Sequence, residues 1–161
     1  MIKIRKANEQ DAQTVFDLRI ASIQSQCTEC YTPQQVEVWT SGTMTDKFVQ
    51  VVERSMYVSE NEGRIVGSGM IDTMSGFIDA IFVQPDFMGR GAAKLMLKHL
   101  ESIAIKKNLS CISLQSTLNA AGFYRSNGYG GDEVSVYYSP RGIELDCVPM
   151  KKWLMPVGDV Q

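Results

Sequence analysis

The segment from Gly76 to Lys106 constrains the fold of this chain more than any other. It opens with Gly76–Gln84, a short stretch rich in Ile, Phe and Val that is typical of a buried strand. Pro85 ends the strand because proline has no backbone N–H to donate. A loop with glycines on both sides of Arg90 follows, and apolar residues then recur at helical spacing from Ala92. The segment therefore predicts a strand, a glycine loop and a helix, in that order.

This order has a chemical use. The first turn of a helix carries backbone N–H groups without internal partners, together with partial positive charge. Glycines allow the backbone to approach an anion closely. The segment therefore predicts a phosphate-binding loop. It is not a P-loop, because no G-K-[ST] follows the glycines, and it lacks the third glycine of the dinucleotide fingerprint.

Residues 83–93 read V-x-P-x-x-M-G-R-G-A-A, which resembles motif A of the GNAT N-acetyltransferase superfamily. That motif is written Q/R-x-x-G-x-G/A and binds the pyrophosphate of acetyl-CoA. Gly91 and Ala93 match it, whereas Met88 stands where Gln or Arg is usual. Because the family's loop holds phosphate mainly through backbone N–H groups, we expect this departure to cost little. The resemblance implies CoA binding by Met88, Gly89, Arg90, Gly91, Ala92 and Ala93.

A second segment, L-N-A-A-G-F-Y-R-S-N-G-Y at 118–129, resembles the superfamily's last helix, commonly N-x-x-x-F-Y-x-x-x-G-F. The matching residues are Asn119, Phe123, Tyr124, Gly128 and Tyr129, and we expect Asn119 to be the N-cap of this short helix. The two segments are independent and occur in the family's order. The resemblance covers about residues 1–153 and identifies the chain as a small, single-domain GNAT protein of bacterial type.

The other elements follow from alternation, helical spacing and caps. Expected helices are one capped by Asn8 that runs to about Gln24, one from Thr32-Pro33 to about Ser41, and one over Asp46–Glu53. Expected strands are Ile2–Lys6, Met56–Ser59, Arg64–Asp72, Ser110–Ser116, Glu133–Ser139 and Ile143–Lys152. Because Ser110–Ser116 follows a strand–helix crossover, we expect it to lie parallel to Gly76–Gln84. No linker or repeat divides the chain, so we expect one domain over 1–161.

The fold class predicted is α+β. The resemblance implies a GNAT fold, with a central, mostly antiparallel twisted sheet of about six or seven strands flanked by about four helices. One parallel pair, Gly76–Gln84 and Ser110–Ser116, is expected to splay apart. The pantetheine arm of acetyl-CoA, the implied cofactor, then pairs with backbone groups of Ile81, Phe82 and Val83 as an added strand would. One of these N–H groups is a candidate donor to the thioester oxygen.

Charge and composition exclude some function classes. The net charge of −2 gives no reason to expect nucleic acid or an anionic membrane as a partner, and no apolar run approaches a membrane span. The N-terminus lacks the apolar core of a signal peptide, so we expect a cytoplasmic protein with reduced cysteines. Cys27-x-x-Cys30 has no second pair, and His99 is the only histidine. We therefore expect no metal site, but two free thiols near a helix end.

Catalysis of N-acetylation requires a neutral amine and a protonated leaving thiol. Phe77 stands where family members often carry a Glu, and Asp79 lies two residues on, on the same strand face. Burial would raise the pKa of Asp79, as a base near neutrality requires. Asp79 is therefore either the base or a residue that makes a structural hydrogen bond or binds the amine; Glu29 and Glu37 are outside candidates.

Tyr124 is expected to protonate the departing thiolate, as the resemblance implies; the alternative is a core aromatic residue. The resemblance implies that the first two helices wall the acceptor site, where Tyr31, Trp39 and Met44 are the candidate residues, although ordinary helix packing accounts for Trp39 at least as well. An aromatic wall suits an aromatic or cationic acceptor. The function predicted is acetyl transfer to a primary amine of a small molecule or peptide by direct attack. The alternatives are a non-catalytic acyl-CoA-binding module and a nucleotide-binding domain unrelated to CoA. A homodimer is an option, because exposed strand edges in this fold often pair.

Overall fold

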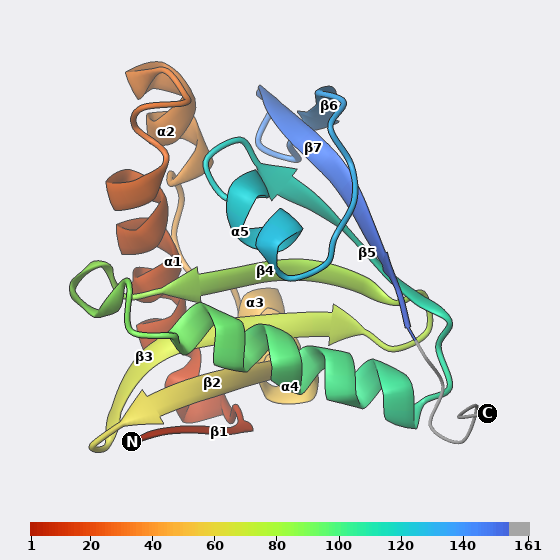
Figure 1. The fold of residues 1–161 in the computed structure, drawn as a ribbon. Helices are drawn as coiled ribbons and strands as arrows, with labels where there is room; N and C mark the ends of the chain where they lie inside the picture. The colour runs from red at the N-terminus through yellow and green to blue at the C-terminus, as the bar shows by residue number, and fades with distance from the viewer. Residues whose placement is uncertain (155–161) are drawn as a thin grey trace.

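The computed structural model of the chain describes residues 1–154, and within them seven strands form one sheet in the order β1-β2-β3-β4-β5-β7-β6 (Figure 1). Neighbouring strands are antiparallel except β4 and β5, which are parallel. The predicted α+β class, the strand number and the parallel pair are thereby confirmed. The strands are β1 (Ile2–Lys6), β2 (Met56–Asn61), β3 (Arg64–Asp72), β4 (Phe77–Val83), β5 (Cys111–Thr117), β6 (Ser135–Tyr138) and β7 (Glu144–Trp153).

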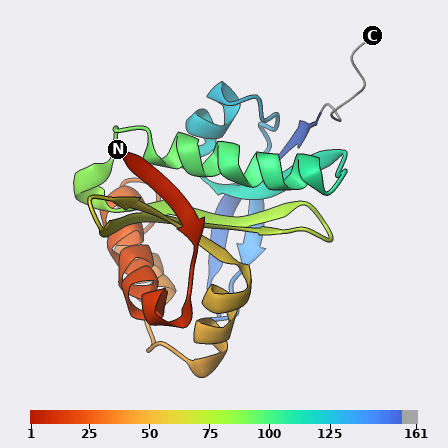
Figure 2. The same ribbon diagram turned by 90° about the horizontal axis from the view of Figure 1, so that it is seen from below.

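Five α-helices flank the sheet in the described part of the chain, where about four were expected. They are α1 (Ala12–Gln26), α2 (Pro33–Trp39), α3 (Asp46–Ser55), α4 (Ala92–Lys106) and α5 (Ala121–Ser126). Seen from below, α4 and α5 lie on one side of the sheet, and α1 and α3 lie on the other (Figure 2). Short 3-10 turns, η1 (Glu9–Asp11) and η2 (Pro85–Phe87), precede α1 and the glycine loop.

Both predicted capping boxes are present, but only the box of Thr32 and Gln35 caps the α-helix that was expected there. The Thr32 side chain accepts from the Gln35 N–H, and the Gln35 side chain accepts from the Thr32 N–H, which closes a capping box at α2. Asn8 and Asp11 form the same box, but around η1, so that α1 itself begins one residue after Asp11. Both boxes use side chains three residues apart, which is why they can be predicted from sequence.

The predicted N-cap of α5 is wrong. Ala120, not Asn119, is the N-cap residue, and it makes no side-chain capping bond. A turn over 118–120 with backbone hydrogen bonds, such as the Ala120 N–H to the Thr117 carbonyl, delays the helix start by one residue. The side chain of Asn119 is thereby released to face a cavity described below.

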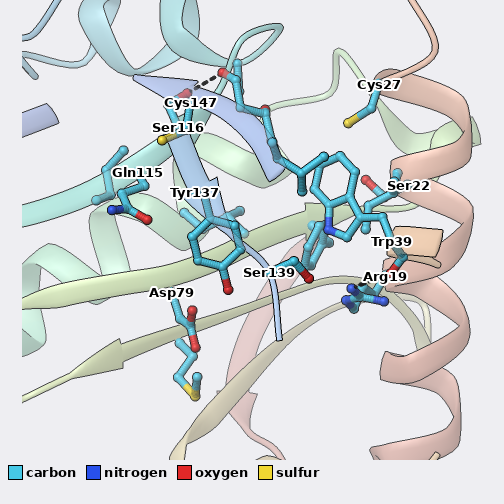
Figure 3. A pocket seen from close by; sticks show the side chains of 18 of the residues that line it. Arg19, Ser22, Cys27, Trp39, Asp79, Gln115, Ser116, Tyr137, Ser139 and Cys147 are labelled. Carbon is cyan, nitrogen blue, oxygen red and sulfur yellow. Dashed lines mark hydrogen bonds between the residues drawn. The ribbon is translucent and has the colours of Figure 1, made fainter. Parts of the chain in front are cut away.

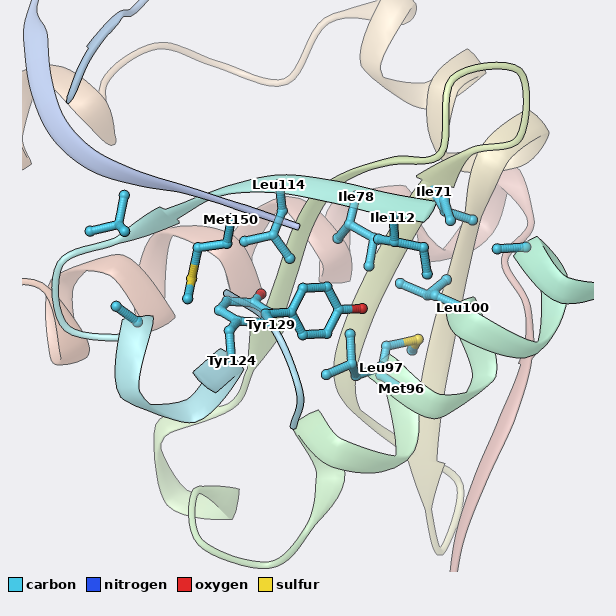
Figure 4. Close-up of a cluster of buried hydrophobic side chains, with 13 residues drawn as sticks. Ile71, Ile78, Met96, Leu97, Leu100, Ile112, Leu114, Tyr124, Tyr129 and Met150 are labelled. Atoms are coloured by element: carbon cyan, nitrogen blue, oxygen red, sulfur yellow. The ribbon is translucent and has the colours of Figure 1, made fainter. Parts of the chain in front are cut away.

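The main hydrophobic core lies between the sheet and the pair α4 and α5 (Figure 4). Its fully buried side chains include Leu97 and Leu100 of α4, Ile78 of β4 and Ile112 of β5. Tyr124 of α5 packs into this core and contacts the ring of Tyr129, with the ring centroids 5.7 Å apart in an edge-to-face arrangement. This packing holds α5 against the sheet next to the place where β4 and β5 separate.

Candidate functional site

The parallel ladder between β4 and β5 is very short. It pairs Phe77 with Ser113 and Ile78 with Leu114, and no further pair is formed. Gly76, directly before this ladder, requires glycine. It has a φ of 77°, and a Cβ there would lie 2.6 Å from the carbonyl oxygen of Cys111. Beyond Ile78 the two strands diverge, as Figure 1 shows. The splayed pair that the resemblance implied is therefore present.

A bulge in β4 coincides with this divergence. On the other edge of β4, Ile71 pairs with Ile78 while Met70 pairs with Ala80, so Asp79 has no partner on β3. A bulge leaves the extra residue out of the ladder and turns its strand. Asp79 thus occupies the point at which β4 changes direction.

A cavity of about 950 Å³ opens at this point, walled by α1, α2, β4, β5 and the turn between β6 and β7 (Figure 3). The structure brings together in its lining seven of the residues predicted from sequence: Tyr31, Trp39, Asp79, Ile81, Phe82, Asn119 and Tyr124. The other predicted residues lie outside this lining: Val83, Met88, Gly89, Arg90, Gly91, Ala92, Ala93 and Phe123. Most of these belong to the glycine loop, which continues from the end of β4.

Asp79 projects into the cavity from β4 (Figure 3). Its carboxylate remains accessible to solvent, but the apolar surroundings raise its pKa above the ordinary value by desolvation. Within residues 1–154 no Lys or Arg forms an ion pair with it. The direction of the pKa shift agrees with the expectation for a carboxylate that accepts a proton near neutrality.

Tyr124 is buried, with 8% of its surface exposed, and it lines the same cavity. Desolvation raises the pKa of its hydroxyl to about 12. The hydroxyl makes no hydrogen bond to any residue of the described chain, whereas the neighbouring Tyr129 donates to Glu101 at 2.8 Å. Tyr124 is therefore a protonated donor without a protein acceptor, at the opening between the splayed strands.

Tyr31 and Trp39 form an aromatic wall, with ring centroids 5.3 Å apart. The Tyr31 hydroxyl is already engaged: it donates to the Asp146 carbonyl at 2.6 Å and accepts from the Leu118 N–H at 3.1 Å. Tyr31 therefore offers the cavity its ring, because its hydroxyl is already hydrogen-bonded within the protein. Met44, expected in the same wall, packs against the core under α3 instead.

Glu29 and Glu37 are exposed and do not line the cavity, which leaves Asp79 as the better placed of the predicted acids. Glu29 belongs to the α1–α2 connection and Glu37 to α2.

The thiols of Cys27 and Cys30 are free, as expected. Cys27 ends α1 and lines the cavity, while Cys30 is exposed. Burial raises the pKa of the Cys27 thiol to about 11, and a hydrogen bond with Asn119 opposes that shift. A thiol in this state is a poor nucleophile at neutral pH. Within residues 1–154, no three His, Cys, Asp or Glu side chains are arranged to hold a metal ion.

The glycine loop leads directly into α4. Gly91 is the N-cap of α4 with a φ of 84°, in the left-handed region, and it has no side-chain cap. The first backbone bond of the helix is donated by Leu95 to the Gly91 carbonyl. Within the described chain, the N–H groups of residues 89–94 have no hydrogen-bond acceptor, and the side chains of Met88 and Arg90 are exposed. These are the properties of an anion-binding helix start.

Sequence reasoning did not identify Arg19 or Arg141, which also line the cavity. A signal for Arg19 was present, because it interrupts the apolar stripe of α1 three residues after Phe16 and four before Ile23. A charged residue on a buried helix face is unusual unless it has a partner there. For Arg141, in the turn of the last hairpin, the sequence carries no comparable signal.

Comparisons with known proteins agree with this geometry. Residues 27–154 match the family model of the acetyltransferase (GNAT) domain. The chain is 24% identical over 128 residues to the uncharacterized N-acetyltransferase YafP of Escherichia coli K12, and the aligned region covers 80% of this chain and 81% of the relative.

Within residues 1–154, no helix combines the length and apolar character that a membrane span needs.

Solved structures share the fold. A GCN5-related N-acetyltransferase from Rhodopseudomonas palustris superposes with a TM-score of 0.87 at 22% identity, covering 94% of this chain and 95% of that one. The PaiA N-acetyltransferase from Thermoplasma acidophilum, solved in complex with coenzyme A, gives a TM-score of 0.70 at 18% identity, covering 96% and 99%. The sequence motifs, the splayed strands and the family match lead to one conclusion: this chain belongs to the GNAT acetyltransferase family and is an acyltransferase.

Proposed function

We propose that the protein transfers the acetyl group of acetyl-CoA to a primary amine of a small molecule or peptide, by direct attack in a ternary complex. One observation carries the proposal. Asp79, with a raised pKa, and Tyr124, a buried hydroxyl without a protein acceptor, line the same cavity where β4 and β5 part. A proton acceptor and a proton donor are the two groups that this reaction needs.

The glycine loop is suited to hold the pyrophosphate of CoA. The N–H groups of residues 89–94 have no acceptor in the described chain, and they sit at the positive end of α4. The side chain of Met88 is 43% exposed, and the N–H groups proposed to bind the pyrophosphate follow it in the chain, so the proposal does not rely on a Gln or Arg side chain at this position.

The edge of β4 that faces β5 is suited to hold the pantetheine arm. Past Ile78 this edge has no ladder partner on β5, while β3 pairs with the other edge through Ile81, Phe82 and Val83. An extended ligand arm can pair with such an edge as an additional strand. When bound, acetyl-CoA supplies the activated acyl group, and an N–H of this edge is the proposed donor to the thioester oxygen.

Asp79 is the proposed base. Its carboxylate, or a water held by it, removes a proton from the bound ammonium, because only the neutral amine attacks. The raised pKa makes the carboxylate a better proton acceptor than an ordinary aspartate. Tyr124 is the proposed acid that protonates the departing thiolate. Its high pKa keeps the hydroxyl protonated at neutral pH.

A second candidate is a non-catalytic module that binds acyl-CoA. The observation in its favour is Phe77, which lines the cavity where many family members carry a Glu. A thiol-release assay with acetyl-CoA and a library of primary amines separates the two. Amine-dependent release of CoA supports the transferase. A rise in melting temperature with CoA but no release with any amine supports the module, and no effect of CoA on melting contradicts both.

A further inference from the structure

Two arginines share one wall of the cavity. Arg19 comes from α1 and Arg141 from the turn between β6 and β7, so elements from opposite ends of the chain bring two positive charges together. Burial lowers the pKa of Arg19, and the nearby Arg141 lowers it further. Like charges that face one another in a partly buried site are unfavourable unless an anion lies between or beside them.

The protein does not supply that anion in the part of the chain that the structure describes. No carboxylate within residues 1–154 forms an ion pair with either arginine. Arg19 donates from Nη2 to the Trp39 carbonyl at 3.0 Å, which fixes the guanidinium, but its buried Nη1 has no acceptor there. A buried guanidinium nitrogen without an acceptor is costly, so an anionic oxygen of a ligand at this position would be favourable.

Arg141 is also held in place. Its Nη1 donates to the carbonyl of Ser41, which ties the last hairpin to the connection between α2 and α3 at the rim of the cavity. Gly42 lies against the same guanidinium, since a Cβ there would fall 2.8 Å from its Nη1. Both arginines are therefore positioned by backbone carbonyls rather than by acids, and their positive charge remains available to a ligand.

Two carboxyl groups line the cavity, those of Asp79 and Asp146, and neither forms an ion pair with Arg19 or Arg141 in the described chain. In Figure 3, Asp79 projects from β4, and Arg19 projects from α1 with Trp39 and Ser139 nearby. The cavity lining also includes apolar side chains, among them Phe16 and Ile23. The cavity thus offers a carboxylate for an amine, a guanidinium wall for an anion, and apolar surface for a side chain.

We propose that the acceptor is a free amino acid with an apolar or aromatic side chain, whose carboxylate is bound by Arg19 and Arg141 while its amine faces Asp79. This inference rests on the transferase function proposed above. A guanidinium is planar and presents paired N–H donors that match the two oxygens of a carboxylate. A peptide acceptor has an amide in place of that carboxylate and leaves the arginine wall without its anion.

Binding of product analogues tests the arginine wall without relying on turnover. N-acetyl-phenylalanine and N-acetyl-phenylalaninamide differ only in the carboxylate, and neither has a free amine. Titration calorimetry with the CoA-saturated protein should show the acid binding about 10- to 100-fold more tightly than the amide, the range for hydrogen bonds to a charged group. Equal binding of the two compounds, or binding of neither, would overturn the proposal.

Variants assign the preference to the arginines. Arg19→Gln and Arg141→Gln should each reduce the preference for the acid. Lys47→Gln removes an exposed cation from the same cavity and should leave the preference for the acid over the amide unchanged. A preference that survives both arginine variants would also overturn the proposal. The CoA-induced rise in melting temperature shows whether each variant folds. If Arg19→Gln does not fold, the test rests on Arg141→Gln, because Arg141 is exposed and its replacement is not expected to affect folding.

Two outcomes separate a failure of the transferase function from a failure of the carboxylate site. If no amine supports release of CoA but the acid still binds through the arginines, the transferase proposal fails and the carboxylate site stands. If phenylalanine and its amide are acetylated at equal kcat/KM, the transferase proposal stands and the carboxylate site fails.

Discussion

Tyr124 and Tyr129 are neighbouring buried tyrosines whose surroundings differ. The Tyr129 hydroxyl donates to the Glu101 carboxylate inside the protein, while the Tyr124 hydroxyl lines the cavity without a partner among residues 1–154. Burial raises the pKa of both, so both remain donors at neutral pH. The two residues thus form a matched pair in which only one hydroxyl is available for chemistry.

Tyr124→Phe removes the available hydroxyl and keeps the ring. We expect kcat to fall by roughly 10- to 1000-fold, toward the lower part of the range for acid catalysis, because a thiolate is a tolerable leaving group. Affinity for CoA should change little. The loss should shrink with a thioester whose thiol is more acidic. Tyr129→Phe is the control and should alter stability rather than kcat; full activity of Tyr124→Phe with every thioester would assign the residue to packing.

Asp79→Asn tests the base. Only the ionised carboxylate accepts a proton, so kcat should fall as the pH drops through the pKa of Asp79. Because desolvation raises that pKa, this acid limb should lie above the ordinary aspartate range. In Asp79→Asn the limb should vanish and kcat should drop by about 100-fold or more. Asp146→Asn removes a carboxyl group from the same cavity and is the control. An unchanged pH profile in Asp79→Asn would leave Asp79 with a structural or binding role.

At the scale of elements, the junction of β4, η2 and α4 joins the cavity to the glycine loop. Phe87 of η2 is buried against Val66 and Val83, and the Arg90 guanidinium lies 5.0 Å from the centre of its ring. This packing anchors the front of the loop, so that the free N–H groups before α4 are held in one arrangement. An arrangement fixed before binding loses less entropy when an anion arrives.

Gly91→Val tests whether the backbone of this loop binds CoA. A β-branched residue is strained at a φ of 84°, so the variant loop should relax, and binding must then restore the strained conformation at about 1–3 kcal/mol. We expect the Kd for CoA to rise by roughly 10- to 100-fold. Met88→Ala is the matched control and should bind normally. An equal loss in Met88→Ala would mean that side chains dominate the binding.

At the scale of the whole molecule, a buried network joins α4 to the C-terminal strand. The carboxylate of Glu101 accepts from the Tyr129 hydroxyl at 2.8 Å and from Lys152 at 3.1 Å. Lys152 also donates to the Asn127 carbonyl at 3.0 Å. The network connects α4 and β7 to the end of α5, the helix that carries Tyr124.

Glu101→Ala should destabilise the protein by about 3–5 kcal/mol, because it leaves the Tyr129 hydroxyl and the partly buried Lys152 without their acceptor. Lys98 also contacts Glu101, but its side chain is 51% exposed, so Lys98→Ala should cost less than about 1 kcal/mol. Urea unfolding of the two variants measures both values. A small cost for Glu101→Ala, similar to that of Lys98→Ala, would refute a structural role for the network.

The features that local sequence determined are those that depend on neighbours a few residues apart. The strand, glycine loop and helix from Phe77 to Lys106 follow from periodicity and from Pro85 and Gly91. The capping box of Thr32 and Gln35 follows from their spacing. The parallel direction of β5 is a longer-range feature, but it follows from the strand–helix crossover that the local patterns predict.

Other features were decided only by the tertiary structure. The bulge at Asp79 depends on how β3 and β4 pair. The meeting of Arg19 with Arg141 requires α1 and the last hairpin to converge on one cavity. The strand pairing and the convergence arise from packing between segments far apart in the chain. A local pattern cannot encode them, because burial and charge at each position depend on which distant residues pack beside it.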